Sequence, residues 1–520
     1  MAAYYSILRK QFNIMLASFN HEYSFMLSID EIKKSYELGE KIVPAIVEWF
    51  KSRNDRTSWE SYEDIYDIDG FKVPYISLLN NWKSNIRDYD RDDIEVKEIA
   101  KCFDLPEELY ETPIPSDAFN GEKCRLAHFD ISSGRFLSFT FQETDYFDYL
   151  KSGEYLDYPY PGNPKLTNRD AFGKTVREHN GHIWAFENLT NICGVGLLIL
   201  TKDNYLILTK HSEKSHVYPG RITFSSSGTM NWGGQLGPFD QVSEKCFSEL
   251  GHRINIKKTK LIGFGADARK LYFQFSFLEI SEHDSDYFLE KLKGATNQSN
   301  NIQRVKFNED ELAEKIMDEC WEPAAEAAVL TALVLKKSKR ELMSSLYSRK
   351  SKWTKRTMKD EWDYRSSKSG LLPVMSVRYP QNKLSAISEE YVDEVMCFIG
   401  NDIRNKSVVE IGSGIGRITE KLANLSKNVT CVELCGRMIS LSMSRLGSLD
   451  NVIYIQSFAQ DYKPAIPHDA AISSLVLIHN TDDNEYEKLI ENLCLTANSI
   501  YIFEDTCSPS AQVGLNSLIA

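Results

Sequence analysis

The residues of this sequence best suited to chemistry are closely spaced glycines flanked by two acids. The glycines Gly412, Gly414 and Gly416 stand at alternate positions. Glu410 precedes them, and Glu433 ends an apolar run further on. Alternating glycines let the backbone adopt dihedral angles closed to other residues and let a ligand approach without meeting a Cβ atom. A carboxylate at the tip of the next strand can hold a ribose diol. The pattern therefore predicts a site for a ligand that contains a nucleoside.

Local patterns predict the elements that position these residues. The β-branched run 407–410 is typical of a strand that ends at the glycines. Apolar residues recur at helical spacing in 417–425, so the glycine turn should lie at a helix N-terminus, where unpaired N–H groups face a ligand. The run 429–432 predicts a second strand that ends at Glu433.

The spacing of the glycines distinguishes two kinds of nucleotide site. A dinucleotide fingerprint reads G-x-G-x-x-G, whereas residues 410–416 read E-I-G-S-G-I-G. This segment resembles the first motif of class I S-adenosylmethionine-dependent methyltransferases, an acid followed by G-x-G-x-G. The runs 451–462, 470–480 and 498–506 are similar to the third, fourth and fifth strands of that family. The resemblance implies a Rossmann-like fold for the C-terminal part of the chain and S-adenosylmethionine as its cofactor.

The resemblance also implies roles for individual cofactor-binding residues. The three glycines would lie against the methionine part of the cofactor, with Glu410 near its ammonium group, and Glu433 would hold the ribose hydroxyls. Ser457 and Phe458 fall where such enzymes line the adenine, although an ordinary structural role is an equal alternative for this pair.

Candidates for catalytic roles follow the fourth and fifth of these strands. His479 ends the fourth, and it is either a general base or a packing residue. Glu504 and Asp505 end the fifth and are candidates for holding a substrate amine. Methyl transfer from a sulfonium is an in-line displacement with a good leaving group, so positioning should supply much of the catalysis. The final helix and hairpin that the resemblance implies are missing after residue 505, which predicts either a truncated domain or an abbreviated form of the family's end.

Composition excludes several classes of protein. A chain of 520 residues should form about three domains. The net charge of −13 makes nucleic acid an unexpected partner. Its ten cysteines include no C-x-x-C pair, so we expect reduced thiols and no metal site, even though Cys431 and Cys435 bracket Glu433. No run is long enough to span a bilayer, and we expect a cytoplasmic protein that binds no membrane. The sequence gives no oligomeric state.

Changes in pattern along the chain predict an α/β multidomain protein. The expected parts are a helical domain (1–115), an aromatic and proline-rich connection (116–180), an α/β/α sandwich with a mixed sheet (181–340), a basic linker (341–375) and the methyltransferase domain (376–520). Residues 92–111 are typical of two short helices, either a plain hairpin or a helix-turn-helix. The basic linker is either a solvated helix or a contact for phosphate or RNA.

The sandwich resembles a Nudix domain, in which a helix presents glutamates to magnesium and a diphosphate. A predicted hairpin at 194–212 precedes the segment 218–228 and a helix at 243–251, which is similar to the Nudix helix R-E-x-x-E-E-x-G. Glu249 matches the last metal glutamate, but Lys245 stands where the first belongs and Ser248 where another belongs. Because magnesium requires carboxylate oxygens, the resemblance implies a degenerate, non-hydrolytic domain.

Two functional hypotheses follow. In the first, the chain methylates a small molecule or specialised metabolite, and its Nudix-like domain assists binding. In the second, that domain binds a nucleotide or phosphorylated ligand, or hydrolyses a diphosphate, and regulates the methyltransferase. Aromatic residues before the first methyltransferase strand, Trp362, Tyr364 and Tyr379, are predicted to lie nearer the cofactor than the Nudix-like helix does.

Overall fold

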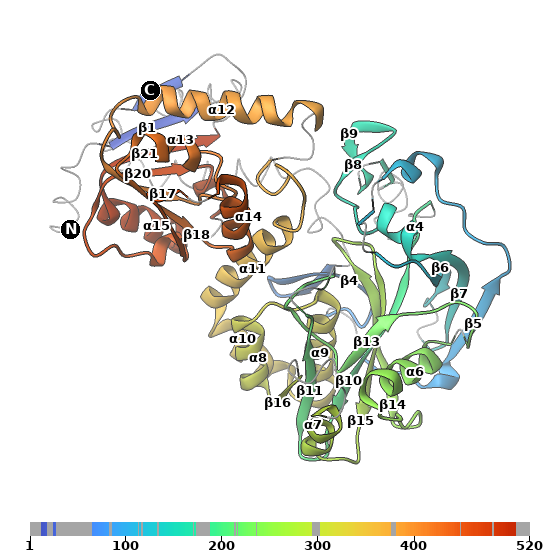
Figure 1. The fold of residues 1–520 in the computed structure, drawn as a ribbon. Helices are drawn as coiled ribbons and strands as arrows, with labels where there is room; N and C mark the ends of the chain where they lie inside the picture. The colour runs from blue at the N-terminus through green and yellow to red at the C-terminus, as the bar shows by residue number, and fades with distance from the viewer. Residues whose placement is uncertain are drawn as a thin grey trace, which may run out of the picture. The chain divides into compact units, whose positions relative to one another are not determined.

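The chain forms two compact units, which are considered separately. The computed structural model describes residues 12–17, 24–27, 65–82, 86–112, 114–115, 118–132, 135–169, 171–172, 188–212, 215, 217–235, 237–293, 302–375, 381–447, 449–480 and 483–505. Thr57–Arg356 form one unit, and Met1–Arg56 with Thr357–Ala520 form the other (Figure 1). This division differs from the five segments expected, since one boundary falls inside helix α11 (Lys350–Arg365).

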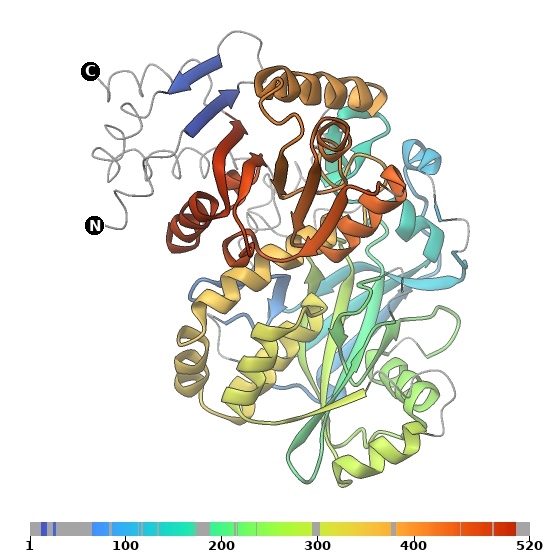
Figure 2. The same cartoon turned by 60° about the vertical axis from the view of Figure 1, so that its left-hand side comes forward.

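The C-terminal unit contains a seven-stranded sheet in the order β19-β18-β17-β20-β21-β1-β2. Its strands are β17 (Ser407–Ile411), β18 (Asn428–Glu433), β19 (Val452–Gln456), β20 (His468–Ser474), β21 (Ala497–Asp505), β1 (Phe12–Ala17) and β2 (Ser24–Leu27). Strands β17 to β21 are parallel to one another, β1 runs parallel to β21, and β2 returns antiparallel to β1. Figure 2 shows β1 and β2 in blue, continuing the sheet beside the red C-terminal strands.

The pairing of β1 and β2 corrects the expectation of a sheet without its last hairpin. A hairpin does extend the sheet beside β21, but it comes from the N-terminus of the chain. The family's order places this hairpin after the fifth strand in the sequence. Strands β1 and β2 lie hundreds of residues before that point, so the family's order does not predict them.

Helices cover both faces of this sheet. They are α12 (Leu384–Ile399), α13 (Thr419–Leu425), α14 (Gly436–Leu446) and α15 (Asp483–Thr496). Buried residues of α12 and α13 pack with Val408 and Ile472 on one face. Buried residues of α15 pack with Val409 and Ile502 on the other. Burial on both faces explains why the strands read as nearly continuous apolar runs.

The unit 57–356 is built on a nine-stranded mixed sheet. Its central order is β12-β11-β10-β15-β14-β4-β3, with β13 paired to β10 and β16 paired to β11. The strands are β3 (Ile65–Ile68), β4 (Phe71–Leu79), β10 (Cys193–Leu200), β11 (Tyr205–Lys210), β12 (Ile222–Thr223), β13 (Ser226–Thr229), β14 (Thr259–Asp267), β15 (Phe273–Ile280) and β16 (Ile302–Lys306). Strand β10 is parallel to β15, whereas the pairs β14–β15 and β4–β14 are antiparallel.

Two long helices cover opposite faces of the mixed sheet. Val195 and Leu197 of β10 pack in the same core as α6 (Pro238–Leu250). Leu198 and Leu200, which alternate with them, pack with α9 (Pro323–Lys336). Successive side chains of a strand point to opposite faces of the sheet, so α6 covers one face and α9 covers the other. The remaining elements are α4 (Tyr146–Lys151), α7 (Ser285–Lys293), α8 (Glu309–Asp318), α10 (Lys339–Tyr347), a sheet of β5 (Ile94–Ile99), β6 (Glu122–Asp130) and β7 (Leu137–Asp145), and the pair β8 (Pro159–Tyr160) and β9 (Asn163–Thr167).

The expectation of a helical domain over 1–115 is wrong for the described residues from 65 onward. Strands β3 and β4 form a hairpin whose turn residues Asp69 and Gly70 both have positive φ. Strand β4 pairs with β14, so residue 115 does not bound a separate sheet. Residues 92–111 are also not two α-helices. They form β5, which pairs with β7, and a short 3-10 helix at Glu107–Glu111. Residues 29–53, which belong to the same expected helical domain, lie outside the described residues.

Several expected elements are confirmed. The hairpin at 194–212 is β10 and β11, with Asn204 at positive φ in its turn. The helix at 243–251 is the C-terminal part of α6, which ends at Gly251 in a left-handed conformation. Further along the chain, α9 is followed at once by α10, a separate helix that begins where the Ser338 side chain caps it.

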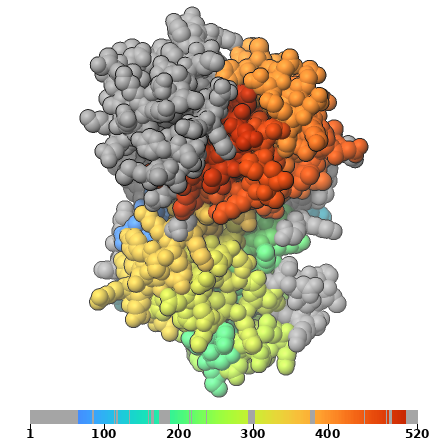
Figure 3. Space-filling view, turned by 90° about the vertical axis from the view of Figure 1, so that its left-hand side faces the viewer, coloured from blue at the N-terminus to red at the C-terminus, as the bar shows by residue number. Residues whose placement is uncertain are grey.

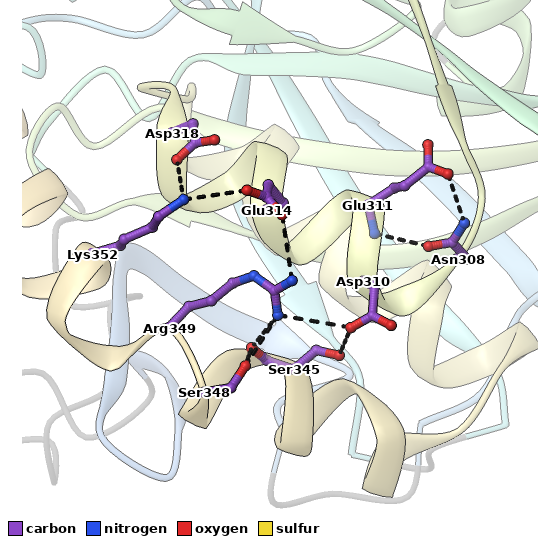
Figure 4. Close-up of polar contacts among 9 residues, drawn as sticks. All are labelled: Asn308, Asp310, Glu311, Glu314, Asp318, Ser345, Ser348, Arg349 and Lys352. Atoms are coloured by element: carbon purple, nitrogen blue, oxygen red, sulfur yellow. Dashed lines mark hydrogen bonds and ion pairs between the residues drawn. The ribbon is translucent and has the colours of Figure 1, made fainter.

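The basic segment after residue 337 forms α10 and α11, and two of its cations are neutralised by α8. Arg349 lies 3.4 Å from Glu314, and Lys352 lies 3.0 Å from Asp318 and 3.3 Å from Glu314 (Figure 4). The yellow helical part of the chain is exposed on the face shown in Figure 3. These cations therefore bind acids of their own unit, which favours the structural interpretation over an RNA contact. None of the helices in the described ranges has the length and apolar character that a membrane span requires.

Candidate functional site

The glycine loop follows β17 directly and has no room for side chains. Gly412, Gly414 and Gly416 have φ values of 70°, 53° and 79°, which L-residues with a Cβ rarely adopt. A Cβ on Gly412 would overlap Val476, and one on Gly414 would lie 2.9 Å from Val374 Cγ1. The sequence requires glycine here for both backbone conformation and close packing.

Glu433 joins the ends of β17 and β18. Its buried carboxylate accepts one hydrogen bond from the Gly414 N–H, at 2.8 Å, and another from the Cys435 N–H, at 2.9 Å. Burial raises the pKa of Glu433, and these N–H groups oppose that rise. A carboxylate has about four lone-pair positions, and the backbone N–H groups of Gly414, Leu434 and Cys435 do not use all of them, so acceptor capacity remains for a ligand donor such as a ribose hydroxyl. The residue thus fixes the glycine loop and keeps capacity for a ligand.

Glu410 lies inside the unit against α13. The Thr419 hydroxyl donates to its Oε2 at 2.6 Å, and the residue is 3% exposed. Burial, with a smaller contribution from the charge of Glu433, raises the pKa of Glu410 to about 8. Glu410 is therefore protonated at neutral pH, and Thr419 is a partner that the motif alone did not indicate.

We expect Glu410→Gln to stabilise the protein in alkaline solution. The folded-state pKa is raised, so the folded protein binds more protons than the unfolded chain above the usual carboxyl pKa, and stability falls as pH rises toward 8. The amide keeps the neutral shape. The thermal midpoint of the variant should match the wild type near pH 5 and exceed it by a few degrees at pH 8.5. Glu420→Gln, at an exposed position on α13, is the control and should show no such pH-dependent gain. A lower midpoint for Glu410→Gln at pH 8.5 would contradict the buried neutral acid.

Ser457 and Phe458 follow β19 and lie beside Glu433. The Ser457 N–H donates to the Glu433 carbonyl at 3.1 Å, and the Ser457 hydroxyl donates to the Phe458 carbonyl at 2.9 Å. Both side chains are half-buried. The structure thus brings this pair to the same edge of the sheet as the glycine loop.

His479 ends a short 3-10 helix after β20 and contacts an aromatic residue of α11. The rings of His479 and Trp362 meet edge to face with their centroids 4.8 Å apart. Burial, together with the charge of Arg365, lowers the pKa of His479 to about 3. The imidazole is therefore neutral at every physiological pH.

The end of α11 and the residues after it cover the glycine loop. Trp362 and Val374 pack in one apolar cluster with Ile415, Cys435 and Met438. Sequence reasoning singled out Trp362 for its aromatic ring, and it missed Val374, for which the sequence carries no distinctive signal.

Three predicted residues cannot be placed in full. Glu504 and Asp505 occupy the carboxyl end of β21, where their backbones pair with β1, but their side chains lie outside the described part of the chain. Tyr379 also falls outside it.

The residues present fit an adenosyl cofactor. The loop has no Cβ atoms at its three glycines, and Glu433 has unused acceptor positions. Two buried polar atoms at the same edge, Ser473 Oγ and Asn480 Oδ1, have no hydrogen-bond partner within the described residues. Buried polar groups nearly always have such partners, so these atoms are consistent with a polar ligand at this edge.

Comparisons with known proteins agree with this assignment. Residues 373–511 match the family model described as Nodulation protein S (NodS). An rRNA adenine N-6-methyltransferase from Escherichia coli is 36% identical over 80 residues, which are 15% of this chain and 31% of that protein. This chain therefore spans under a third of the length of that relative.

Solved methyltransferase structures are similar to part of this chain. Phosphoethanolamine N-methyltransferase 1 from Haemonchus contortus is 22% identical, covering 30% of this chain and 34% of its own, with a TM-score of 0.27. NodS from Bradyrhizobium japonicum WM9 in complex with S-adenosylhomocysteine is 19% identical, covering 28% and 67%, with a TM-score of 0.23.

By its glycine motif, its strand order and the family match, this part of the chain is similar to class I S-adenosylmethionine-dependent methyltransferases, and S-adenosylmethionine is the cofactor that this similarity implies.

Proposed function

We propose that this chain transfers a methyl group from S-adenosylmethionine to a small-molecule acceptor. The observation that carries the proposal is the Gly412–Gly416 loop held by Glu433. The bound cofactor supplies an electrophilic methyl group. The protein's own residues would orient the cofactor. The three glycines would allow close approach of its methionine part, and Glu433 would accept hydrogen bonds from the ribose hydroxyls. Ser457 and Phe458 would line the adenine.

The acceptor would enter beside His479 and Trp362. Glu504 and Asp505, at the end of β21, remain candidates for holding an acceptor amine. A small acceptor is favoured because the chain carries a net charge of −13 and because Arg349 and Lys352 are paired with acids.

An adenine of RNA is the second candidate acceptor, and the partial match to the rRNA methyltransferase favours it. Incubation of the full chain with S-adenosylmethionine labelled in its methyl group distinguishes the two. The substrates would be a low-molecular-weight cell extract and purified ribosomal RNA. We expect label in small molecules, and label confined to RNA would overturn the small-molecule proposal.

We expect His479 to orient the acceptor through a hydrogen bond from a neutral imidazole, and we do not expect the ring to become protonated. Its pKa of about 3 leaves it unprotonated between pH 5 and 9, so no His479 ionisation should appear in the pH profile of kcat. His479→Phe should keep affinity for S-adenosylhomocysteine within about twofold and lower kcat by about tenfold or more, because loss of an orienting hydrogen bond misplaces the acceptor. An unchanged kcat would assign His479 to packing alone.

For residues 181–340 we propose a Nudix-like fold that acts as a binding module for a nucleotide or phosphorylated ligand. The mixed sheet between α6 and α9 supports this fold. Glu249 accepts hydrogen bonds from the Ser226 hydroxyl at 2.6 Å and from the Ser227 N–H at 3.2 Å. Its carboxylate therefore binds groups of the protein rather than a metal ion. Magnesium-dependent diphosphate hydrolysis that Glu249→Gln abolishes would replace the binding module with a second enzyme.

A further inference from the structure

One residue at the carboxyl end of β20 has a backbone conformation that leucine rarely adopts. Leu475, the first residue after β20, has a φ of 56°. A left-handed conformation costs free energy in a residue with a bulky side chain, and residues of this kind cluster at functional sites, where their surroundings hold them. The Leu475 N–H donates to the Phe503 carbonyl of β21 at 2.7 Å. The chain therefore turns sharply at the edge of the sheet that carries the glycine loop.

This turn, residues 474–476, connects the glycine loop with the segment that carries His479. A Cβ on Gly412 would overlap the side chain of Val476. The Val476 carbonyl accepts hydrogen bonds from the His479 N–H, at 3.2 Å, and from Asn480 Nδ2, at 3.1 Å. The position of the turn thus sets the position of His479 relative to the glycine loop.

Tyr391 of α12 holds the first residue of this turn. A hydrogen bond joins its hydroxyl to the Ser474 hydroxyl, with the two oxygens 2.5 Å apart. Tyr391 is 6% exposed and belongs to the hydrophobic cluster against which Leu475 packs. Alternation along β20 would place Ser474 and Leu475 on opposite faces of the sheet, but the left-handed conformation directs both toward the face that α12 covers. Tyr391 therefore stabilises the turn through a hydrogen bond and through the cluster around it.

We propose that Tyr391 is a positioning residue for methyl transfer. Its hydroxyl fixes Ser474, and the turn then holds His479 and the acceptor in line with the methyl group. In-line displacement depends on alignment, and a misplacement of about 1 Å can lower a rate about 100-fold. The role is indirect, because Tyr391 acts through Ser474. This inference rests on the proposed methyl transfer and adds to its site a residue from a helix that precedes the glycine motif.

The test compares rates of label transfer from saturating S-adenosylmethionine by the 520-residue chain and its variants. The acceptor is a low-molecular-weight cell extract or purified ribosomal RNA, whichever the wild type labels. Tyr391→Phe removes only the hydroxyl and should lower the rate about tenfold or more, while affinity for S-adenosylhomocysteine stays within about twofold. The matched control is Tyr462→Phe, which removes a buried hydroxyl bonded to His468 Nε2, at 2.9 Å, at the start of the same strand. It should leave the rate unchanged.

A double-mutant cycle with Ser474→Ala shows whether the two hydroxyls act as one unit. Ser474→Ala should lower the rate as Tyr391→Phe does, and the double variant should lie within about twofold of either. A wild-type rate for Tyr391→Phe would overturn the proposal, and so would additive losses in the cycle. An equal loss of S-adenosylhomocysteine affinity would instead mark Tyr391 as a structural residue. A wild-type chain that labels neither acceptor would overturn the proposed methyl transfer and this role together, so the two failures are distinguishable.

Discussion

Replacing Glu433 with alanine should weaken the binding of S-adenosylhomocysteine by about 10- to 100-fold. The change removes the acceptor for the ribose hydroxyls, and a hydrogen bond to a charged group contributes about 1.5–3 kcal/mol. It also releases the N–H groups of Gly414 and Cys435, which the carboxylate now holds. Calorimetry on the full chain measures the loss directly.

Two variants calibrate this result. Glu433→Gln retains one acceptor oxygen and should fall between the wild type and Glu433→Ala. Glu420→Gln removes an exposed carboxylate from the neighbouring helix and should bind like the wild type. If Glu433→Ala also binds like the wild type, Glu433 does not hold the ribose.

Gly416→Ala should abolish detectable cofactor binding and destabilise the C-terminal unit. The new Cβ would overlap Ser442 Oγ and lie 2.9 Å from Leu446 Cδ1 on α14. The Ser442 side chain is fully buried and hydrogen-bonded to the Tyr454 hydroxyl at 2.9 Å, so it cannot move without losing that bond. Overpacking typically costs about 1–3 kcal/mol, to which the positive φ adds about 1–2 kcal/mol.

Gly447→Ala separates the cost of overpacking from the cost of the positive φ. Gly447 also has positive φ, at 65°, but a Cβ there meets nothing within 4 Å. It should therefore show only the backbone cost, with cofactor affinity unchanged. Equal losses of affinity in the two variants would mean that close packing around Gly416 does not shape the site.

The sequence was sufficient to predict the central part of this site. Alternating glycines, flanked by short apolar runs, specify strand, turn and helix locally, because positive φ and close approach both require glycine. The ends of β17 and β18 therefore follow from residues that are near one another in the chain. The same local logic predicts the β10–β11 hairpin.

Features that depend on distant parts of the chain were not predictable in this way. The pairing of β1 with β21 joins segments at opposite ends of the sequence, and no local pattern marks it. The Trp362–His479 contact likewise depends on where α11 ends in space. Strand β5 was mistaken for a helix because its six residues are too few for periodicity to separate the two structures.

The most direct test of the central claim is a calorimetric titration of the unmodified 520-residue chain with S-adenosylhomocysteine, beside an identical titration with NAD⁺. The loop spacing and the position of Glu433 predict one site per chain for S-adenosylhomocysteine, with a dissociation constant in the micromolar range, about −8 kcal/mol at 1 μM. NAD⁺ should give no binding heat. The absence of binding by S-adenosylhomocysteine, or a preference for NAD⁺, would contradict the account.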